Sequence, residues 1–105
     1  NTNAAFSVER TSNPAVRVAV KAFKKGNYAK SVQFSQQALR SGLSKSRASV
    51  AQSNLCASHA MLGEMDKAAE ACEAALELKP ENETAIANSK ALTVKLAQMN
   101  SQAGN

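Results

Sequence analysis

The chain has 105 residues, which is enough for one domain of ordinary size and not for two. Alanine supplies 21 of them, and this composition, with one tyrosine and no tryptophan, argues against a β-sandwich or barrel and favours closely packed helices. No stretch approaches the roughly 18 apolar residues that a membrane span needs, so no span is predicted. The net charge of +5 is divided unevenly, because residues 1–50 carry +8 and residues 51–105 carry −3.

Five helices are predicted in chain order from apolar residues at three- and four-residue spacing. The first begins at Pro14, behind an Asn13 N-cap, and ends at Gly26-Asn27. The others are predicted over residues 28–41, 47–62, 65–78 and 83–99. Outside them, residues 1–11 are predicted to be a flexible N-terminal segment and residues 100–105 a flexible tail.

The chain repeats itself at an offset of 37 residues, from Gly26 to Gly63. The stretch Gly26-Asn27-Tyr28-Ala29-Lys30-Ser31 aligns with Gly63-Glu64-Met65-Asp66-Lys67-Ala68. Each stretch joins two predicted helices. A unit of this size, built from a helix, a tight turn and a helix, is typical of helical repeat arrays.

The second unit, residues 49–82, resembles the tetratricopeptide repeat (TPR) family, whose pattern W-x2-L-G-x2-Y…A-x3-F…P marks the contact seam of a helix pair. Gln52 stands for the tryptophan, and the remaining pattern positions hold Leu55, Cys56, His59, Ala68, Cys72, Ala75 and Pro80. In the first unit the corresponding places hold Val18, Ala19, Ala22, Ser31, Ser35 and Ala38, with Leu43 where the proline would be. The resemblance implies an all-α fold: a right-handed α-solenoid of two TPR-like helix hairpins and a C-terminal capping helix. The implied TPR domain covers residues 12–99, as repeat 1 (12–45), repeat 2 (49–82) and the capping helix (83–99).

Through this resemblance we expect a non-enzymatic protein–protein interaction module that holds a peptide or helix of another protein in an apolar concave groove. The inward-facing residues are predicted to be Val16, Val20, Phe23, Val50, Ala57 and Met61. Asn54 matches one position of the carboxylate-clamp subset of the family, but Thr84 and Asn88 do not match theirs, so that mode is not expected. Two alternatives stay open. The groove residues are core positions misplaced by a residue or two, or Phe6 and Val8 of the head fold back and close the groove.

A second function hypothesis is a structural or assembly module that self-associates through the ends of its solenoid. A basic first half and an acidic second half would attract one another head to tail, giving a weak homo-oligomer. A specific nucleic-acid site is not expected, since few aromatic side chains accompany the lysines near Gly26. The sequence offers no catalytic constellation and no cofactor motif.

Cys56 and Cys72 lie at nearly equal distances on either side of Gly63, so two antiparallel helices would bring them to the same height on the seam. A disulfide is predicted, with an inert reduced pair as the alternative. A metal site is not expected, because His59 is the one histidine. Small bacterial cell-envelope proteins of the repeat family look similar in carrying one cysteine on each helix of a hairpin. This favours a periplasmic or otherwise extracytoplasmic location over the cytoplasmic alternative, and Asn1 leaves open whether a leader preceded it.

Overall fold

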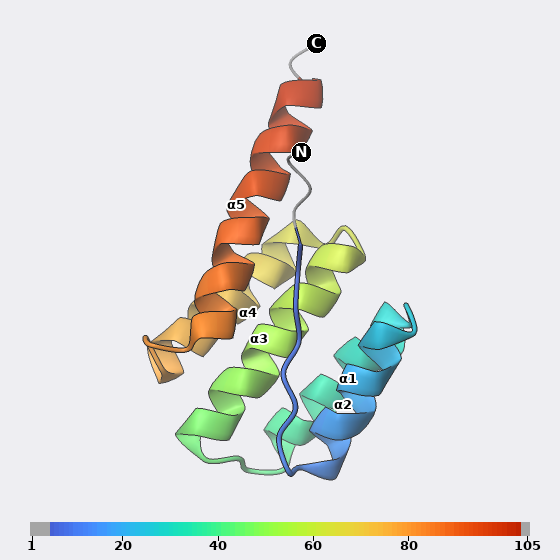
Figure 1. Ribbon diagram of the computed structural model, residues 1–105, viewed down its shortest axis with the longest axis vertical. Coiled ribbons are helices and arrows are strands. Elements are labelled where there is room, and N and C mark those ends of the chain that lie inside the picture. The colour runs from blue at the N-terminus through green and yellow to red at the C-terminus, as the bar shows by residue number, and fades with distance from the viewer. Residues whose placement is uncertain (1–4, 104–105) are drawn as a thin grey trace.

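The computed structural model of the chain describes residues 5–103, and Figure 1 shows them as five α-helices with no strand among them. Helix α1 spans Pro14–Lys24, α2 Tyr28–Arg40, α3 Lys45–Met61, α4 Met65–Leu78 and α5 Glu83–Ala103. The predicted all-α fold is confirmed. The outermost parts of the expected flexible ends, residues 1–4 and 104–105, lie outside the described residues.

Side-chain caps explain where the helices begin. Asn13 accepts hydrogen bonds from two amides in the first turn of α1, as predicted for an N-cap. Ser44 accepts one from the amide of Arg47, and α3 therefore begins at Lys45, two residues before its predicted start. Asn82 caps α5 through its side-chain oxygen.

Helix α5 is longer than predicted. The expectation of a fifth helix over 83–99 and a flexible tail from residue 100 is corrected, because residues 100–103 are helical. Neither glycine nor proline occurs between Glu83 and Ala103, so nothing in the sequence stops the helix at Met99. The last turns of α5 project beyond the other helices in Figure 1.

Both hairpins turn at a glycine with a left-handed backbone. Gly26 has φ of 80° and Gly63 has φ of 81°. The amide of the next residue then donates to a carbonyl five residues back, at 2.8 Å for Asn27 and 2.9 Å for Glu64. This pattern satisfies the last carbonyls of a helix and needs φ > 0 at the glycine. The two hairpins therefore turn in the same way, 37 residues apart.

Small side chains line the contacts between neighbouring helices, which lets the backbones approach closely. The buried ones are Ser31, Ser35 and Ala38 on α2, and Ala68, Ala71, Cys72 and Ala75 on α4. Cys56 of α3 and Cys72 of α4 form the predicted disulfide, with their Cα atoms 5.2 Å apart. The high alanine content is therefore the composition of a closely packed seam.

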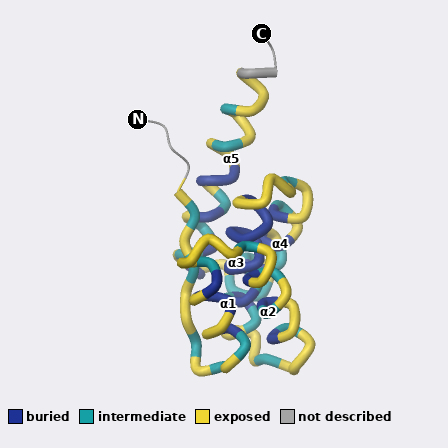
Figure 2. The backbone as a smooth tube through the Cα atoms, turned by 90° about the vertical axis from the view of Figure 1, so that its right-hand side faces the viewer, coloured by how far each residue is buried: buried dark blue, intermediate teal, exposed yellow. Residues whose placement is uncertain are grey.

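Helix α3 is the centre of the molecule. It packs against α2, α4 and α5, and nearly every residue from 51 to 60 is buried. Figure 2 shows this concentration of buried residues along α3, while the far end of α5 is mostly exposed.

Candidate functional site

Residues 5–11 run across α3 without helical structure, in the direction opposite to that helix (Figure 1). We call them the N-terminal segment. Phe6 packs against the core cluster that contains Leu55, and Val8 packs against the cluster that contains Val16. Phe6 and Val8 thus fold back onto the helices, and the segment covers the face of α1, α3 and α5 on which the groove was predicted. We call this the groove face.

Asn54 of α3 binds the backbone of Glu9 through two hydrogen bonds. Its Oδ1 accepts from the Glu9 amide at 2.8 Å, and its Nδ2 donates to the Glu9 carbonyl at 2.8 Å. The Asn54 side chain is completely buried. Both bonds involve main-chain atoms of Glu9, so they are independent of the side chain at that place.

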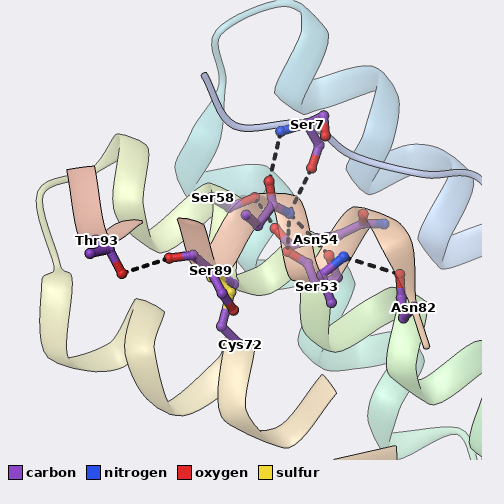
Figure 3. The surroundings of a disulfide bond; sticks show 11 residues. Ser7, Ser53, Asn54, Ser58, Cys72, Asn82, Ser89 and Thr93 are labelled. Atoms are coloured by element: carbon purple, nitrogen blue, oxygen red, sulfur yellow. Dashed lines mark hydrogen bonds between the residues drawn. A yellow bond between two sulfur atoms is a disulfide. The ribbon is translucent and has the colours of Figure 1, made fainter. Parts of the chain in front are cut away.

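Asn88 of α5 holds Ser7 in the same manner. Its Oδ1 accepts from the Ser7 amide at 3.0 Å, and its Nδ2 donates to the Ser7 carbonyl at 3.0 Å. The same Nδ2 also lies 3.0 Å from the Ser53 hydroxyl. Figure 3 shows Ser7 above Ser53 and Asn54. The amide of Asn88 therefore joins the segment to both α5 and α3.

The two asparagines fit an extended chain. Ser7 and Glu9 are two residues apart, which is the period at which an extended backbone presents its polar groups to the same side. The side chains of Ser7 and Glu9 are exposed. Val8, which lies between them, and Phe6, which precedes them, are half-buried. The segment is thus held as a strand-like peptide by side-chain amides rather than by a neighbouring strand.

The charged side chains of the segment differ in their surroundings. The Glu9 carboxylate accepts a hydrogen bond from the Thr84 hydroxyl of α5 at 3.2 Å. Arg10 instead lines a pocket of about 430 Å³ beside α1. The other lining residues are Arg17, Val18, Val20, Lys21 and Lys24.

The predicted groove residues lie in three environments. Val16, Val20 and Ala57 are buried, and Val50 is half-buried. Phe23 lies at the hairpin turn, where its ring contacts the edge of Tyr28 with centroids 5.1 Å apart. Met61 is 42% exposed at the end of α3.

Asn54 and Asn88 were not among the predicted groove residues, and they change the character of this face. The predicted groove is apolar, but the face on which it was predicted carries two fully buried amides beside Ser53. A signal was present in the sequence. Asn54 is the sixth residue of the unit 49–82, and Asn88 is the sixth residue after that unit. Asn88 therefore has the position in α5 that Asn54 has in α3, the first helix of the unit.

The disulfide lies close to Asn54 along the chain. Cys56 follows Asn54 by two residues, and Ser58 Oγ lies 2.8 Å from the Asn54 carbonyl and 2.8 Å from Ser31 Oγ. Asn54 is therefore fixed between contacts to α2 and a covalent link to α4.

His59 and Glu64 form a contact across the turn of the second hairpin. Nδ1 of the nearly buried His59 lies 2.7 Å from Oε1 of the exposed Glu64 carboxylate. This hydrogen bond, with a smaller contribution from the nearby Lys67 charge, lowers the pKa of Glu64 below its ordinary value. The pair thus joins the last turn of α3 to the start of α4.

Across residues 5–103, no cluster of three or more His, Cys, Asp or Glu side chains could hold a metal ion. In the same range, none of the helices combines the length and apolar character needed to cross a bilayer.

Comparison with known families adds one decisive finding, at the helix pair that carries the disulfide. Residues 49–82 match the tetratricopeptide repeat model. The match covers about a third of the chain and includes all of α3 after its first turn, all of α4 and the Asn82 cap. This tetratricopeptide repeat implies a protein–protein interaction module, and such repeats are typically non-catalytic. No curated protein and no solved structure matches the chain.

Proposed function

We propose that this chain is a non-enzymatic protein–protein interaction module whose groove face binds an extended segment of a partner protein. The observation that carries the proposal is the pair of two-way hydrogen bonds from Asn54 and Asn88 to the backbone of Glu9 and Ser7. Main-chain contacts of this kind accept an extended chain from any source. A helical ligand is disfavoured, because its own N–H and C=O groups are already bonded within the helix.

Selection of short displayed peptides on the full chain tests this function. Because Asn54 also holds the chain's own residue Glu9, the affinities are measured in a chain whose own segment is disabled by Phe6→Ser and Val8→Ser. In that chain we expect enriched peptides whose affinity falls about tenfold when Asn54→Ala is added, since each lost hydrogen bond contributes on the order of 1 kcal/mol. Asn54 is preferable to a groove valine, because Val16 and Val20 belong to the core. Gln33→Ala, on the exposed side of α2, is the matched control. Peptides that bind equally to Asn54→Ala would remove the groove face from the proposal.

A second candidate function, self-association through an end of the solenoid, is supported by the far end of α5. Val94, Leu96 and Met99 on this helix are each at least 36% exposed, as are Met61 and Leu62 at the end of α3. Exposed apolar side chains gathered at one end of a small protein are typical of an interface. Sedimentation velocity separates the two functions. Leu96→Lys is expected to abolish an oligomer that the control Thr93→Lys leaves intact, and a monomeric wild type in both low and high salt would exclude this candidate.

We also propose an extracytoplasmic location, which rests on the Cys56–Cys72 disulfide. Disulfides persist in oxidising compartments and are rare where glutathione and thioredoxin keep thiols reduced. Trapping thiols with an alkylating agent in the native host tests it. Cysteines that are alkylated without prior reduction would contradict the proposal.

A further inference from the structure

The N-terminal segment indicates which residues a ligand of the groove face must carry, and this inference rests on the proposed function. The first requirement is a pair of apolar side chains. Phe6 and Val8 are the segment's two side chains that pack on the two core clusters, and Ser7 between them points away. A ligand in the same place needs two apolar side chains two residues apart, the first one aromatic in size.

The next requirement is an acidic residue after the second apolar one. Glu9 stands there, with its carboxylate 3.2 Å from the Thr84 hydroxyl. Glu9 is also the one acidic residue in the first half of the chain. The charges around it in the structure are mixed, because the pocket that Glu9 lines includes Lys79 as well as Glu81 and Glu83, so the Thr84 hydroxyl is the contact that favours a carboxylate at this place.

Arg10, the residue after Glu9, has a charge of the same sign as the side chains around it. Arg10 lines a pocket with Arg17, Lys21 and Lys24, and no acidic residue is among the pocket's lining residues. Four like charges around one pocket repel one another, and the repulsion is strongest at low salt. A ligand with a carboxylate in place of Arg10 would exchange this repulsion for attraction.

The N-terminal segment buries little apolar surface, and four main-chain hydrogen bonds to Asn54 and Asn88 hold it in place. Ala5, Ser7, Glu9 and Arg10 are exposed, and Phe6 and Val8 are only half-buried. Segments with little buried apolar surface and no helical hydrogen bonds open at low free-energy cost. The tether to α1 gives the segment a high effective concentration at the groove face, which a ligand must overcome.

We propose that the groove face binds a partner protein through an extended segment of the pattern aromatic, any residue, aliphatic, acidic, acidic. The chain's own Phe6-Ser7-Val8-Glu9-Arg10 departs from this pattern at its last position, and the partner segment displaces it. The N-terminal segment is then a weak internal occupant that prevents binding of segments that lack the second acid.

Fluorescence anisotropy with two labelled peptides tests the proposal. One peptide has the sequence of residues 5–12, and the second differs from it by glutamate in place of Arg10. The protein is the full chain, either wild type or with its own segment disabled by Phe6→Ser and Val8→Ser. If this double variant does not fold, Val8→Ser alone replaces it.

Both peptides are expected to bind the disabled variant about tenfold or more tightly than wild type, because the tethered competitor is gone. The glutamate peptide is expected to bind about fivefold more tightly than the arginine peptide at low salt, with the difference shrinking at high salt. N-methylation at the Glu9 amide should abolish binding, whereas N-methylation at the Val8 amide, which has no hydrogen bond to the groove face, is the matched control. In the full chain, Arg10→Glu should weaken binding of either peptide relative to Arg40→Glu.

Four results would overturn the proposal. Equal affinity of wild type and the disabled variant would show that the segment does not compete for the site. Equal affinity of the two peptides at low salt would remove the acidic requirement. A wild-type dimer that either peptide dissociates would assign the groove face to the N-terminal segment of a second copy. Selected peptides that depend on Asn54 but lack this pattern would overturn this inference alone and leave the proposed function intact.

Discussion

Asn54 and Asn88 occupy the same position in successive first helices, and each holds the amide and the carbonyl of one residue of the same extended segment. The distance between equivalent positions of α3 and α5 therefore sets the distance between the two contacts on the segment. Asn54 of α3 meets Glu9, and Asn88 of α5 meets Ser7, two residues earlier in the segment. An additional repeat with an asparagine at this place would extend the same pattern by one more contact.

Removing the Asn54 amide should release the middle of the N-terminal segment. Asn54→Ala breaks both hydrogen bonds to Glu9, and we expect the free energy of unfolding to fall by about 1–3 kcal/mol. Hydrogen exchange of the Glu9 amide should accelerate more than that of the Ser7 amide, which Asn88 retains. Asn100→Ala, on the exposed end of α5, is the control. Unchanged exchange at Glu9 would contradict the assigned role.

The disulfide should contribute a large part of the stability. A double Cys56→Ala and Cys72→Ala variant is expected to lose about 3 kcal/mol, because the link closes a loop of 16 residues in the unfolded chain. Urea unfolding with and without reducing agent measures this, and the variant itself should not respond to the reducing agent. Intact mass under non-reducing conditions should be two protons below that of the reduced chain. Native alkylation of either cysteine in the untreated protein would be inconsistent with the link.

The His59–Glu64 contact should make stability depend on pH in the acid range. The pKa of Glu64 is lowered in the folded chain, so its contribution is present above the unfolded pKa and is lost as the pH falls through the folded one. The melting temperature of wild type should therefore exceed that of Glu64→Gln at neutral pH, and the difference should vanish in strong acid. Glu73→Gln, exposed on α4, is the control. A difference that is the same at all pH values would argue against the hydrogen bond.

Two buried serines should respond oppositely to replacement by alanine. Ser35 Oγ is the buried side-chain oxygen without a hydrogen-bond partner among the described residues, so Ser35→Ala should be neutral or stabilising. Ser49 Oγ donates to the Ala75 carbonyl and accepts from Asn82, so Ser49→Ala should cost about 1–3 kcal/mol. Thermal unfolding of the two variants side by side gives the comparison. A loss of stability in Ser35→Ala as large as that in Ser49→Ala would indicate that the Ser35 hydroxyl has a partner.

The helices and the disulfide could be predicted because their determinants are local. Asn13, the glycine turns and the alanine spacing act within a few residues, and the cysteine pair is related by the symmetry of one hairpin. The start of α3 differs from the prediction, because Ser44 caps the helix two residues earlier than the apolar spacing indicates. A single hydrogen bond decides whether a helix includes a further turn at its end, because that turn changes the free energy of the chain little.

The sequence predicts the groove face less completely than it predicts the helices and the disulfide. Phe6 and Val8 are two apolar residues in a short polar stretch, and a pattern that short does not distinguish a strand-like segment from a loose end. Their partners lie far away in sequence: Ser7 and Asn88 are 81 residues apart. A buried asparagine in a helix also gives no apolar signal, so Asn54 and Asn88 stayed outside the predicted groove although their equal spacing was visible.

The separation between Ser7 and Asn88 sets an order of events during synthesis. The N-terminal segment is made first, but its bonds to Asn88 form only after α5 has been translated, 81 residues later. At about 5–20 residues per second, this delay is about 4–16 s. In the later part of that interval, between the synthesis of Asn54 and that of Asn88, the growing chain presents Asn54 before its internal occupant can be fully seated. A partner that meets the chain while it is being made therefore finds less competition than one that meets it afterwards.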